Sequence, residues 1–149
     1  MKIAEITTRQ VPTVNPDLSL HDACRLMQES DVTVLPVMQN GRLVGTVCEH
    51  ELASRCCIEG CNPKRMTVGR VMNGNPAVCA RDLPLRSALT QMQKLQRTDL
   101  IVVDPNGSVA GVVTLFALLD LLRERLSADD GDGPELGYVR RVRGGEPAL

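Results

Sequence analysis

Apolar and polar positions follow the same order twice along the chain. The first copy has an apolar run at 34–37, the pair Asn40-Gly41, and a second apolar run that ends at residue 48. The second copy repeats this order, with apolar runs at 100–103 and 109–114 around the pair Asn106-Gly107. Asn and Gly both accept the positive φ angles of a tight hairpin turn. Each copy therefore predicts a β-hairpin, and each hairpin leads directly into a helical pattern.

A helix with one apolar face is predicted before each hairpin. Ser19 is a suitable N-cap for the first of these helices, with Asp22 at the capping-box position, and we expect the helix to end near Ser30. The apolar side chains recur at i, i+3, i+4 and i+7 in both copies. They are Leu20, Ala23, Cys24 and Met27, then Leu85, Ala88, Leu89 and Met92. The offset of 65 residues between the two faces indicates an internal duplication.

Each copy also has a short strand ahead of its first helix and a second helix after its hairpin. The strands are predicted at 12–14 and 76–78, and the second helices at 49–58 and 115–126. In the first copy the expected inner face of this helix is Leu52, Ala53 and Cys56. The helix of the second copy is strongly apolar at Leu115, Leu118, Leu119 and Leu122. The chain thus reads as a mixed α/β fold of tandem βαββα repeats. Two such copies can bury against each other the face that neither buries alone.

This duplication divides the chain into three segments. The first repeat is predicted to span residues 1–65 and the second residues 66–126. Residues 127–149 contain a run of Asp, Gly and Pro followed by an Arg-rich stretch, with too little apolar content for a core of their own. We therefore expect a flexible C-terminal tail.

Composition and charge argue against several classes of function. The 149 residues contain 17 Lys and Arg against 18 Asp and Glu, and the net charge of -1 gives no general attraction to nucleic acid. The aromatic residues are Phe116 and Tyr138, too few for platforms on which bases stack. No apolar run approaches the roughly 20 residues of a membrane span, and the first residues lack a signal-peptide core. We expect a soluble, cytoplasmic protein that binds neither nucleic acid nor membrane.

Several short motifs occur in a characteristic order within residues 1–126. They are Val34-Leu35-Pro36-Val37, Leu43-Val44-Gly45, Glu49-His50-Glu51-Leu52, Val68-Gly69-Arg70-Val71-Met72 and Gly107 through Thr114. Together they resemble a pair of CBS domains, the regulatory Bateman module. The resemblance implies two repeats related by a pseudo-twofold axis, two clefts between their sheets, and a homodimer. It also implies a sensing role with AMP, ADP, ATP, NAD or S-adenosylmethionine as ligand, and no required cofactor.

The first cleft is the favoured site under this resemblance. It implies that Val14 and Pro36 pack against the base of the ligand. Cys48 stands where the family has a hydroxyl residue, and Glu51 stands where it has the Asp that binds ribose. Glu51 keeps the charge on a longer side chain, whereas Cys48 is only a weak hydrogen-bond donor. His50 and Arg55 are the expected neighbours of a phosphate group.

The second cleft has a weaker set of residues. The resemblance implies base packing by Val78 and Ile101 and a hydroxyl from Thr114. The acidic position is Ala117, which accepts no hydrogen bond from ribose. Burying an unpaired hydroxyl costs roughly 1 to 3 kcal/mol, so we expect binding mainly in the first cleft.

A structural explanation exists for each of these residues. Thr114 is a suitable N-cap for the helix after it, and Glu51 lies in a first helical turn, where the dipole favours a carboxylate. Glycines at the turns and close contacts need no ligand either; they are Gly41, Gly45, Gly107 and Gly111. A dimerisation or scaffold module whose sites have lapsed therefore stays open as an alternative, favoured by Cys48 and Ala117.

The six cysteines and two histidines leave two further alternatives to weigh. Cys56, Cys57 and Cys61 cluster, with Cys48 and His50 nearby in sequence, as in a zinc or redox site. The paired Cys-x-x-Cys spacing is missing, however, and Cys56 and Cys24 replace leucines of the second repeat, so we predict small apolar core residues and no metal. No nucleophile motif, phosphate loop or catalytic carboxylate pair is found, which predicts a non-enzymatic protein. The sequence names no effector protein.

Overall fold

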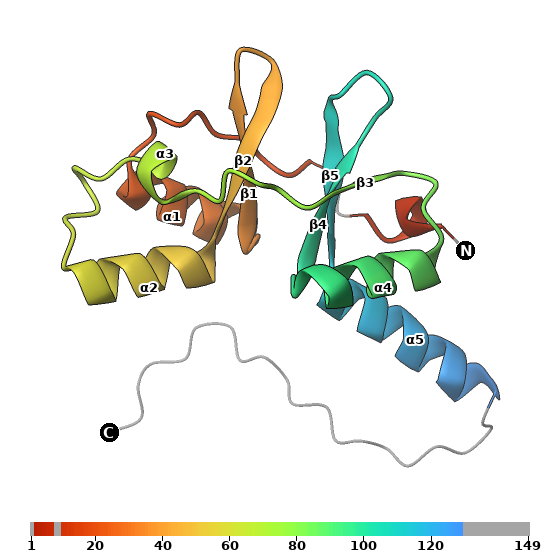
Figure 1. Cartoon of the computed structure of the whole chain (residues 1–149). Helices are drawn as coiled ribbons and strands as arrows, with labels where there is room; N and C mark the ends of the chain where they lie inside the picture. The colour runs from red at the N-terminus through yellow and green to blue at the C-terminus, as the bar shows by residue number, and fades with distance from the viewer. Residues whose placement is uncertain (1, 8–9, 130–149) are drawn as a thin grey trace, which may run out of the picture.

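Two small sheets, each with helices packed against it, lie side by side in the computed structural model (Figure 1). The structure describes residues 2–7 and 10–129. The first half contains α1 (Leu20–Ser30), β1 (Val34–Gln39), β2 (Arg42–Cys48) and α2 (Glu49–Glu59). The second half contains β3 (Val78–Ala80), α4 (Leu85–Leu95), β4 (Asp99–Val103), β5 (Val109–Thr114) and α5 (Leu115–Asp129). The predicted mixed α/β fold, with a helix, hairpin and helix repeated, is confirmed.

The segment that opens each repeat packs against the half built by the other repeat. The short helix η1 (Ile3–Glu5) places Ile3 in the core of the second half, and α3 (Val68–Val71) places Val68 in the core of the first. The Val68 N–H donates to the Leu18 carbonyl at 2.8 Å, and the Ile3 N–H donates to the Leu83 carbonyl at 3.1 Å. These contacts join the two repeats. The repeat boundary after residue 65 stays a prediction.

The two hairpins have equivalent registers. Val34 pairs with Cys48 in the first hairpin, and Asp99 pairs with Thr114 in the second. Asp99 therefore occupies the position of Val34, so 34–37 corresponds to 99–102. Matching 34–37 with the apolar run at 100–103 is wrong by one residue, because cross-strand pairing sets the register and the second copy begins its strand with a charged residue.

The two hairpin turns differ. Asn40 has φ 51° and Gly41 φ 74°, which confirms the predicted tight turn in the first hairpin. In the second, Gly107 has φ 84° but Asn106 has no positive φ. The Gly107 N–H donates to the Asp104 carbonyl at 2.8 Å, which closes a four-residue turn with Pro105 and Asn106 at its centre. Pro is favoured at the second position of such a turn. The predicted positive φ at Asn106 is therefore wrong.

The strand predicted at 12–14 is reduced to a single bridge. Val14 pairs in parallel with Val37, and its N–H donates to the Pro36 carbonyl at 3.0 Å. Pro12 and Pro16 flank Val14 and lack the N–H groups that a longer ladder would need. In the second repeat, β3 begins only at Val78, two residues after Pro76, and pairs in parallel with β4.

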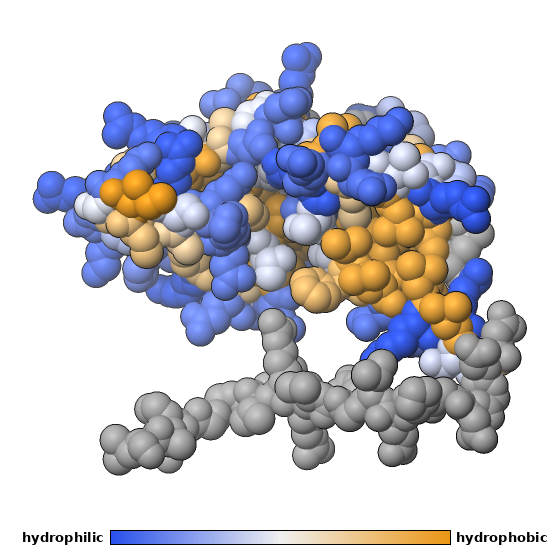
Figure 2. Space-filling model, turned by 60° about the horizontal axis from the view of Figure 1, so that its bottom comes forward, coloured by the Kyte–Doolittle hydropathy of each residue, from blue (hydrophilic) through white to orange (hydrophobic). Residues whose placement is uncertain are grey.

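Helix α1 begins and ends as predicted, but some apolar faces are wider than the core that they cover. The Asp22 N–H donates to Ser19 Oγ at 3.2 Å, and the last helical residue is Ser30. Cys24 and Ala53 are exposed, and Leu119 is 49% exposed. Placing Cys24 and Ala53 on buried faces is wrong, because each lies at the edge of its helical stripe. Figure 2 shows a hydrophobic surface gathered over the second half.

Helix α5 is 15 residues long and ends at Asp129, three residues beyond the predicted end at Leu126. No glycine or proline interrupts the helix before Gly131. The predicted flexible tail therefore begins inside a helix, and its residues 130–149 lie outside the described residues. Within residues 2–7 and 10–129, no helix has the length and apolar content to cross a bilayer.

Three buried clusters hold the fold together. One lies between the helices and sheet of the first half and another occupies the same place in the second half. The third joins the two halves through Val34, Ile101 and Val112, each at most 2% exposed. Alternate strand residues point to these different clusters, as the period of a strand requires.

Gly45 of β2 offers a test of this packing. A Cβ atom at Gly45 would lie 2.6 Å from the Asn73 carbonyl oxygen and 2.9 Å from Met72 Sδ, whereas a Cβ atom at Gly74 would meet nothing within 4 Å. We expect Gly45→Ala to lower the free energy of unfolding by about 1 to 3 kcal/mol through overpacking. Denaturant unfolding measures this, with Gly74→Ala as the control. Equal stability of the two variants would contradict the close approach of β2 and the Met72-Asn73 segment.

Candidate ligand-binding site

A pocket of about 340 Å³ lies beside the first turns of α2. Its walls come from α2 and from the segment that follows α3. They are lined by His50, Glu51, Ser54, Arg55, Val71, Met72 and Asn73. The pocket therefore brings together three residues predicted for the first cleft, His50, Glu51 and Arg55.

The start of α2 is held by a reciprocal pair of hydrogen bonds. The Glu51 N–H donates to Cys48 Sγ at 3.5 Å, and the Cys48 N–H donates to Glu51 Oε2 at 3.4 Å. This is a capping box in which a thiol replaces the usual hydroxyl. The predicted structural explanation for Glu51 is thus present in the fold. The bond to Glu51 Oε2 is long, and Glu51 Oε1 has no hydrogen-bond partner among the described residues, so it can accept from a donor in the pocket.

The basic residues of the pocket are accessible to solvent. Arg55 Nη1 donates to Glu59 Oε1 at 2.9 Å, one helical turn further along α2. Both side chains are about half exposed, and such a surface pair contributes little to stability. His50 is exposed on the first turn. Arg55 can therefore exchange Glu59 for an anionic ligand group at small cost.

The opposite wall of the pocket is fixed by backbone pairing. Thr46 of β2 and Asn73 exchange two hydrogen bonds, at 3.0 Å from the Thr46 N–H and 2.8 Å from the Asn73 N–H. Thr46 is 1% exposed. The Met72-Asn73 wall is thereby paired with β2, and neither residue is recognisable from its local sequence as part of a site.

Asp99 and Arg97 form a polar cluster that sequence reasoning missed. Asp99 is 9% exposed, and its Oδ2 atom has no hydrogen-bond partner among the described residues. Arg97 Nη2 lies 4.0 Å from this oxygen and donates to Thr46 Oγ1 at 3.3 Å, across the contact between the halves. Burial raises the pKa of Asp99, the Arg97 guanidinium opposes this, and Glu51 adds to it. A charged residue at the head of an apolar strand was the available signal.

The other predicted site residues lie apart from the pocket. Val14 and Pro36 are buried beside each other, Val14 in the core of the first half. Ile101 is fully buried in the contact between the halves, and Val78 is 39% exposed on β3. Thr114 Oγ1 accepts from the Ala117 N–H at 3.2 Å and so caps α5. The ligand roles assigned to these residues stay predictions.

The cysteines are distributed between core and surface. Cys61 Sγ lies 3.1 Å from Cys56 Sγ, and this hydrogen bond, with some burial, raises the pKa of Cys56 to about 11. Burial alone raises the pKa of Cys79 to about 11. Cys24 and Cys57 are exposed, so the prediction of small core residues is wrong for Cys24. In the part of the chain that the structure describes, no three His, Cys, Asp or Glu side chains are placed to hold a metal ion.

Comparison with known proteins settles the family. The profile of the CBS domain matches residues 3–56 and again residues 68–124. The chain belongs to the CBS domain family. It contains two CBS domains in tandem, which confirms the resemblance found in the sequence.

Relatives and solved structures agree with this assignment. The chain is 30% identical over 118 residues to the CBS domain-containing protein YhcV of Bacillus subtilis, covering 76% of this chain and 79% of YhcV. It is 27% identical over 122 residues to the uncharacterized protein MJ1232 of Methanocaldococcus jannaschii, covering 82% of this chain and 40% of that protein. The first curated relatives are matched over only 14% to 40% of their lengths.

The fold also matches a solved CBS pair. The CBS domain pair of protein MJ0100, solved in complex with 5′-methylthioadenosine and S-adenosyl-L-methionine, superposes with a TM-score of 0.76 at 21% identity. The match covers 84% of this chain and 98% of the solved chain. This likeness establishes the arrangement of the two repeats.

Asp99 provides a test of the polar cluster between the CBS repeats. A carboxyl whose pKa is raised by folding destabilises the protein at neutral pH, and this cost disappears as the pH falls through the raised pKa. Asp99→Asn keeps the shape and removes the charge. We expect a higher melting midpoint than that of the wild type at pH 7, with the difference shrinking as the pH approaches the ordinary Asp value of 3.8.

Asp104→Asn is the matched control. Its hydrogen bond from Arg81 lowers the pKa of Asp104, so the ionised carboxylate favours the fold above the ordinary pKa. This substitution should leave the midpoint unchanged or lower it at pH 7. A lower midpoint for Asp99→Asn would show instead that Arg97 more than compensates the burial of Asp99.

Proposed function

We propose that this CBS pair is a non-enzymatic, cytoplasmic regulatory module that binds an adenosine derivative in the pocket beside α2. The observation that carries the proposal is the meeting of His50, Glu51 and Arg55 in one pocket of about 340 Å³. Small-molecule sites in proteins begin at roughly this size. Binding would bias the packing of the repeats or subunits, because a ligand shifts only an equilibrium whose states it binds differently.

The pocket has a complementary group for each part of such a ligand. The Oε1 oxygen of Glu51, which has no partner among the described residues, accepts hydrogen bonds from ribose hydroxyls. The exposed His50 and Arg55 and the N-terminal end of the 11-residue helix α2 favour an anionic group. Met72 and Asn73 offer an apolar thioether and an amide to the base. The complex of the MJ0100 pair with two adenosine derivatives supports the ligand class.

Thermal unfolding with added ligand tests this proposal. AMP, ADP, ATP, NAD, S-adenosylmethionine and 5′-methylthioadenosine are added separately, and the midpoint is compared with that of the unliganded protein. A ligand at 100 times its Kd adds about 2.7 kcal/mol to the free energy of unfolding. We expect such a shift with at least one of these compounds, and a Kd about tenfold weaker for Glu51→Gln, which loses one charge-assisted hydrogen bond.

Glu51→Gln is chosen because glutamine preserves a capping box, so the unliganded stability should change little. Glu49→Gln is the matched control, since Glu49 is exposed on the same turn and does not line the pocket. No shift with any compound would favour the alternative of a scaffold module with lapsed sites. A shift that Glu51→Gln leaves unchanged would place the ligand elsewhere.

We further propose that the chain forms a homodimer through the outer face of α5 and the end of α4. Phe116 is 80% exposed, Leu126 65%, Leu95 50% and Leu119 49%. Figure 2 shows a hydrophobic surface over the second half, the half to which α4 and α5 belong. The equivalent positions on α2 are polar or small, as at His50 and Ala53. A second copy supplies the same apolar surface, and a twofold axis makes such a surface self-complementary.

Sedimentation analysis tests the dimer. We expect Phe116→Asp to weaken self-association by at least about tenfold, because it places a charge in an apolar contact. Ile58→Asp is the control, since Ile58 is 84% exposed but lies on α2. The dimer proposal fails if the wild type is monomeric at tens of micromolar, or if Ile58→Asp weakens association as much as Phe116→Asp does.

A further inference from the structure

Four of the six cysteines lie together in the first half of the molecule. Cys61 Sγ donates a hydrogen bond to Cys56 Sγ at 3.1 Å. Negative charge on Cys24 of α1 or on Cys57 of α2 raises the pKa of Cys56 further, so both lie within electrostatic range of it. The proposed ligand pocket and the proposed dimer face include none of these residues. A group of four thiols therefore has no part in either proposal.

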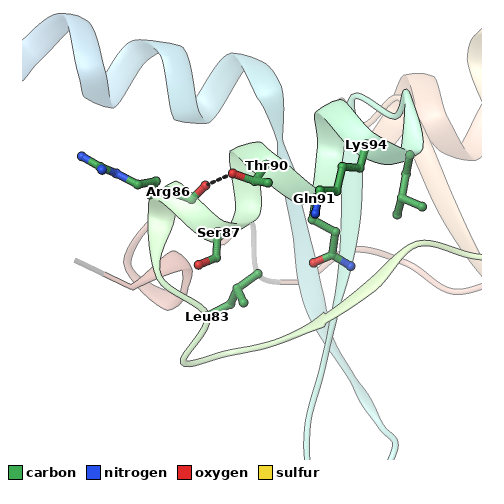
Figure 3. A pocket seen from close by; sticks show the side chains of 7 residues that line it. Leu83, Arg86, Ser87, Thr90, Gln91 and Lys94 are labelled. Atoms are coloured by element: carbon green, nitrogen blue, oxygen red, sulfur yellow. Dashed lines mark hydrogen bonds between the residues drawn. The ribbon is translucent and has the colours of Figure 1, made fainter.

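The second half builds the same elements without cysteine at these positions. By the register of the hairpins, Leu122 of α5 stands where α2 has Cys56. Helix α4, the counterpart of α1, has Leu89 in place of Cys24. The outer face of α4 carries instead an open pocket of about 500 Å³, and no cysteine lines it (Figure 3). Leucine thus satisfies the fold at both positions, and the gathering of thiols in the first half points to their chemistry.

Cys56 and Cys61 are placed for a disulfide bond. The sulfur atoms of a disulfide are about 2.0 Å apart, so these two atoms, at 3.1 Å, must approach by only about 1 Å. Gly60 ends α2 with φ 60° and redirects the chain, so that Cys61 follows the turn directly. Cys61 itself belongs to no helix or strand. It can therefore move by this distance without disrupting a regular element.

The neighbouring thiols are less suitable partners for Cys56. Cys57 is exposed and follows Cys56 directly in α2, and adjacent residues of a helix do not face each other. Cys24 is exposed on α1, which packs beside α2, and it influences Cys56 only through its charge. The geometry therefore selects Cys61 as the partner.

We propose that Cys56 and Cys61 form a reversible disulfide bond when the protein meets hydrogen peroxide. The thiolate of one cysteine attacks a peroxide oxygen, the O–O bond breaks, and hydroxide leaves and takes up the proton that the thiol released, which gives a sulfenic acid and water. The sulfur of the other cysteine then attacks the first sulfur, the S–O bond breaks, and a second water leaves. Two thiols are thereby oxidised by two electrons, and peroxide is reduced to two water molecules. A dithiol reductant restores both thiols by exchange.

The environment of the pair sets its reactivity. Both side chains are half-buried and pack against the core of the first half, so a small oxidant has access to them. The hydrogen bond from Cys61 raises the pKa of Cys56 to about 11. Since the thiolate is the nucleophile, the reduced pair reacts slowly at neutral pH and faster as the pH rises.

Peroxide treatment of the reduced full-length protein at pH 8 tests this site. Free thiols are then blocked with N-ethylmaleimide, and digestion with trypsin and a Glu-specific protease yields the peptides 56–59 and 60–64. These cuts separate Cys61 from Cys56 and Cys57. We expect a disulfide link between the two peptides that is several-fold more abundant than any other cysteine link and that dithiothreitol removes.

Two variants identify the partners of this link. Cys57→Ser removes the exposed neighbour and should leave the yield of the link unchanged, whereas Cys61→Ser should abolish it. Mixing unlabelled and ¹⁵N-labelled protein distinguishes a link within a chain from one between chains. The proposal fails if the wild type keeps all four thiols free, if links to Cys24 or links between chains predominate, or if Cys57→Ser removes the link.

Discussion

The burial of Val34, Ile101 and Val112 between the two halves is the contact on which the other features depend. These side chains come from different repeats and are almost fully removed from water. Their burial holds β1 against β4 and β5, and across the same contact Arg97 of the second half reaches Thr46 of the first at 3.3 Å. The same contact brings the charge of Asp99 within range of Glu51 at the start of α2. Hydrophobic burial thereby fixes where the polar groups can interact.

The two repeats share a backbone but differ in chemistry. Asp99 stands where the first repeat has Val34, and Ala117 stands where it has Glu51. Helix α5 exposes Phe116 and Leu119 at positions where α2 has His50 and Ala53. In our proposals the first half binds the ligand and the second provides the contact between copies. A duplicated fold permits this division, since the shared core does not depend on residues at the surface.

Local signals in the sequence predicted most elements correctly. The cap at Ser19, the turn at Asn40-Gly41 and the periodicity of both helix pairs depend on residues within a few positions of one another. Errors arose where a neighbour distant in sequence intervened. Cys24 fits the helical period but lies at the edge of the face that the sheet covers. The strand predicted at 12–14 failed for a local reason instead: the prolines around Val14 lack the N–H groups that a ladder needs, and only one bridge to Val37 remains.

The sequence alone determined the repeats, their order, and the family to which they belong. It also predicted His50, Glu51 and Arg55 as residues of a ligand site, because all three follow the first hairpin within a short distance along α2. The tertiary structure decided that Met72 and Asn73 complete their pocket, that Asp99 is buried beside Arg97, and that the opening segment of each repeat packs on the other half. Helix periods and turn preferences act over a few residues, whereas burial and desolvation depend on atoms that only folding brings together.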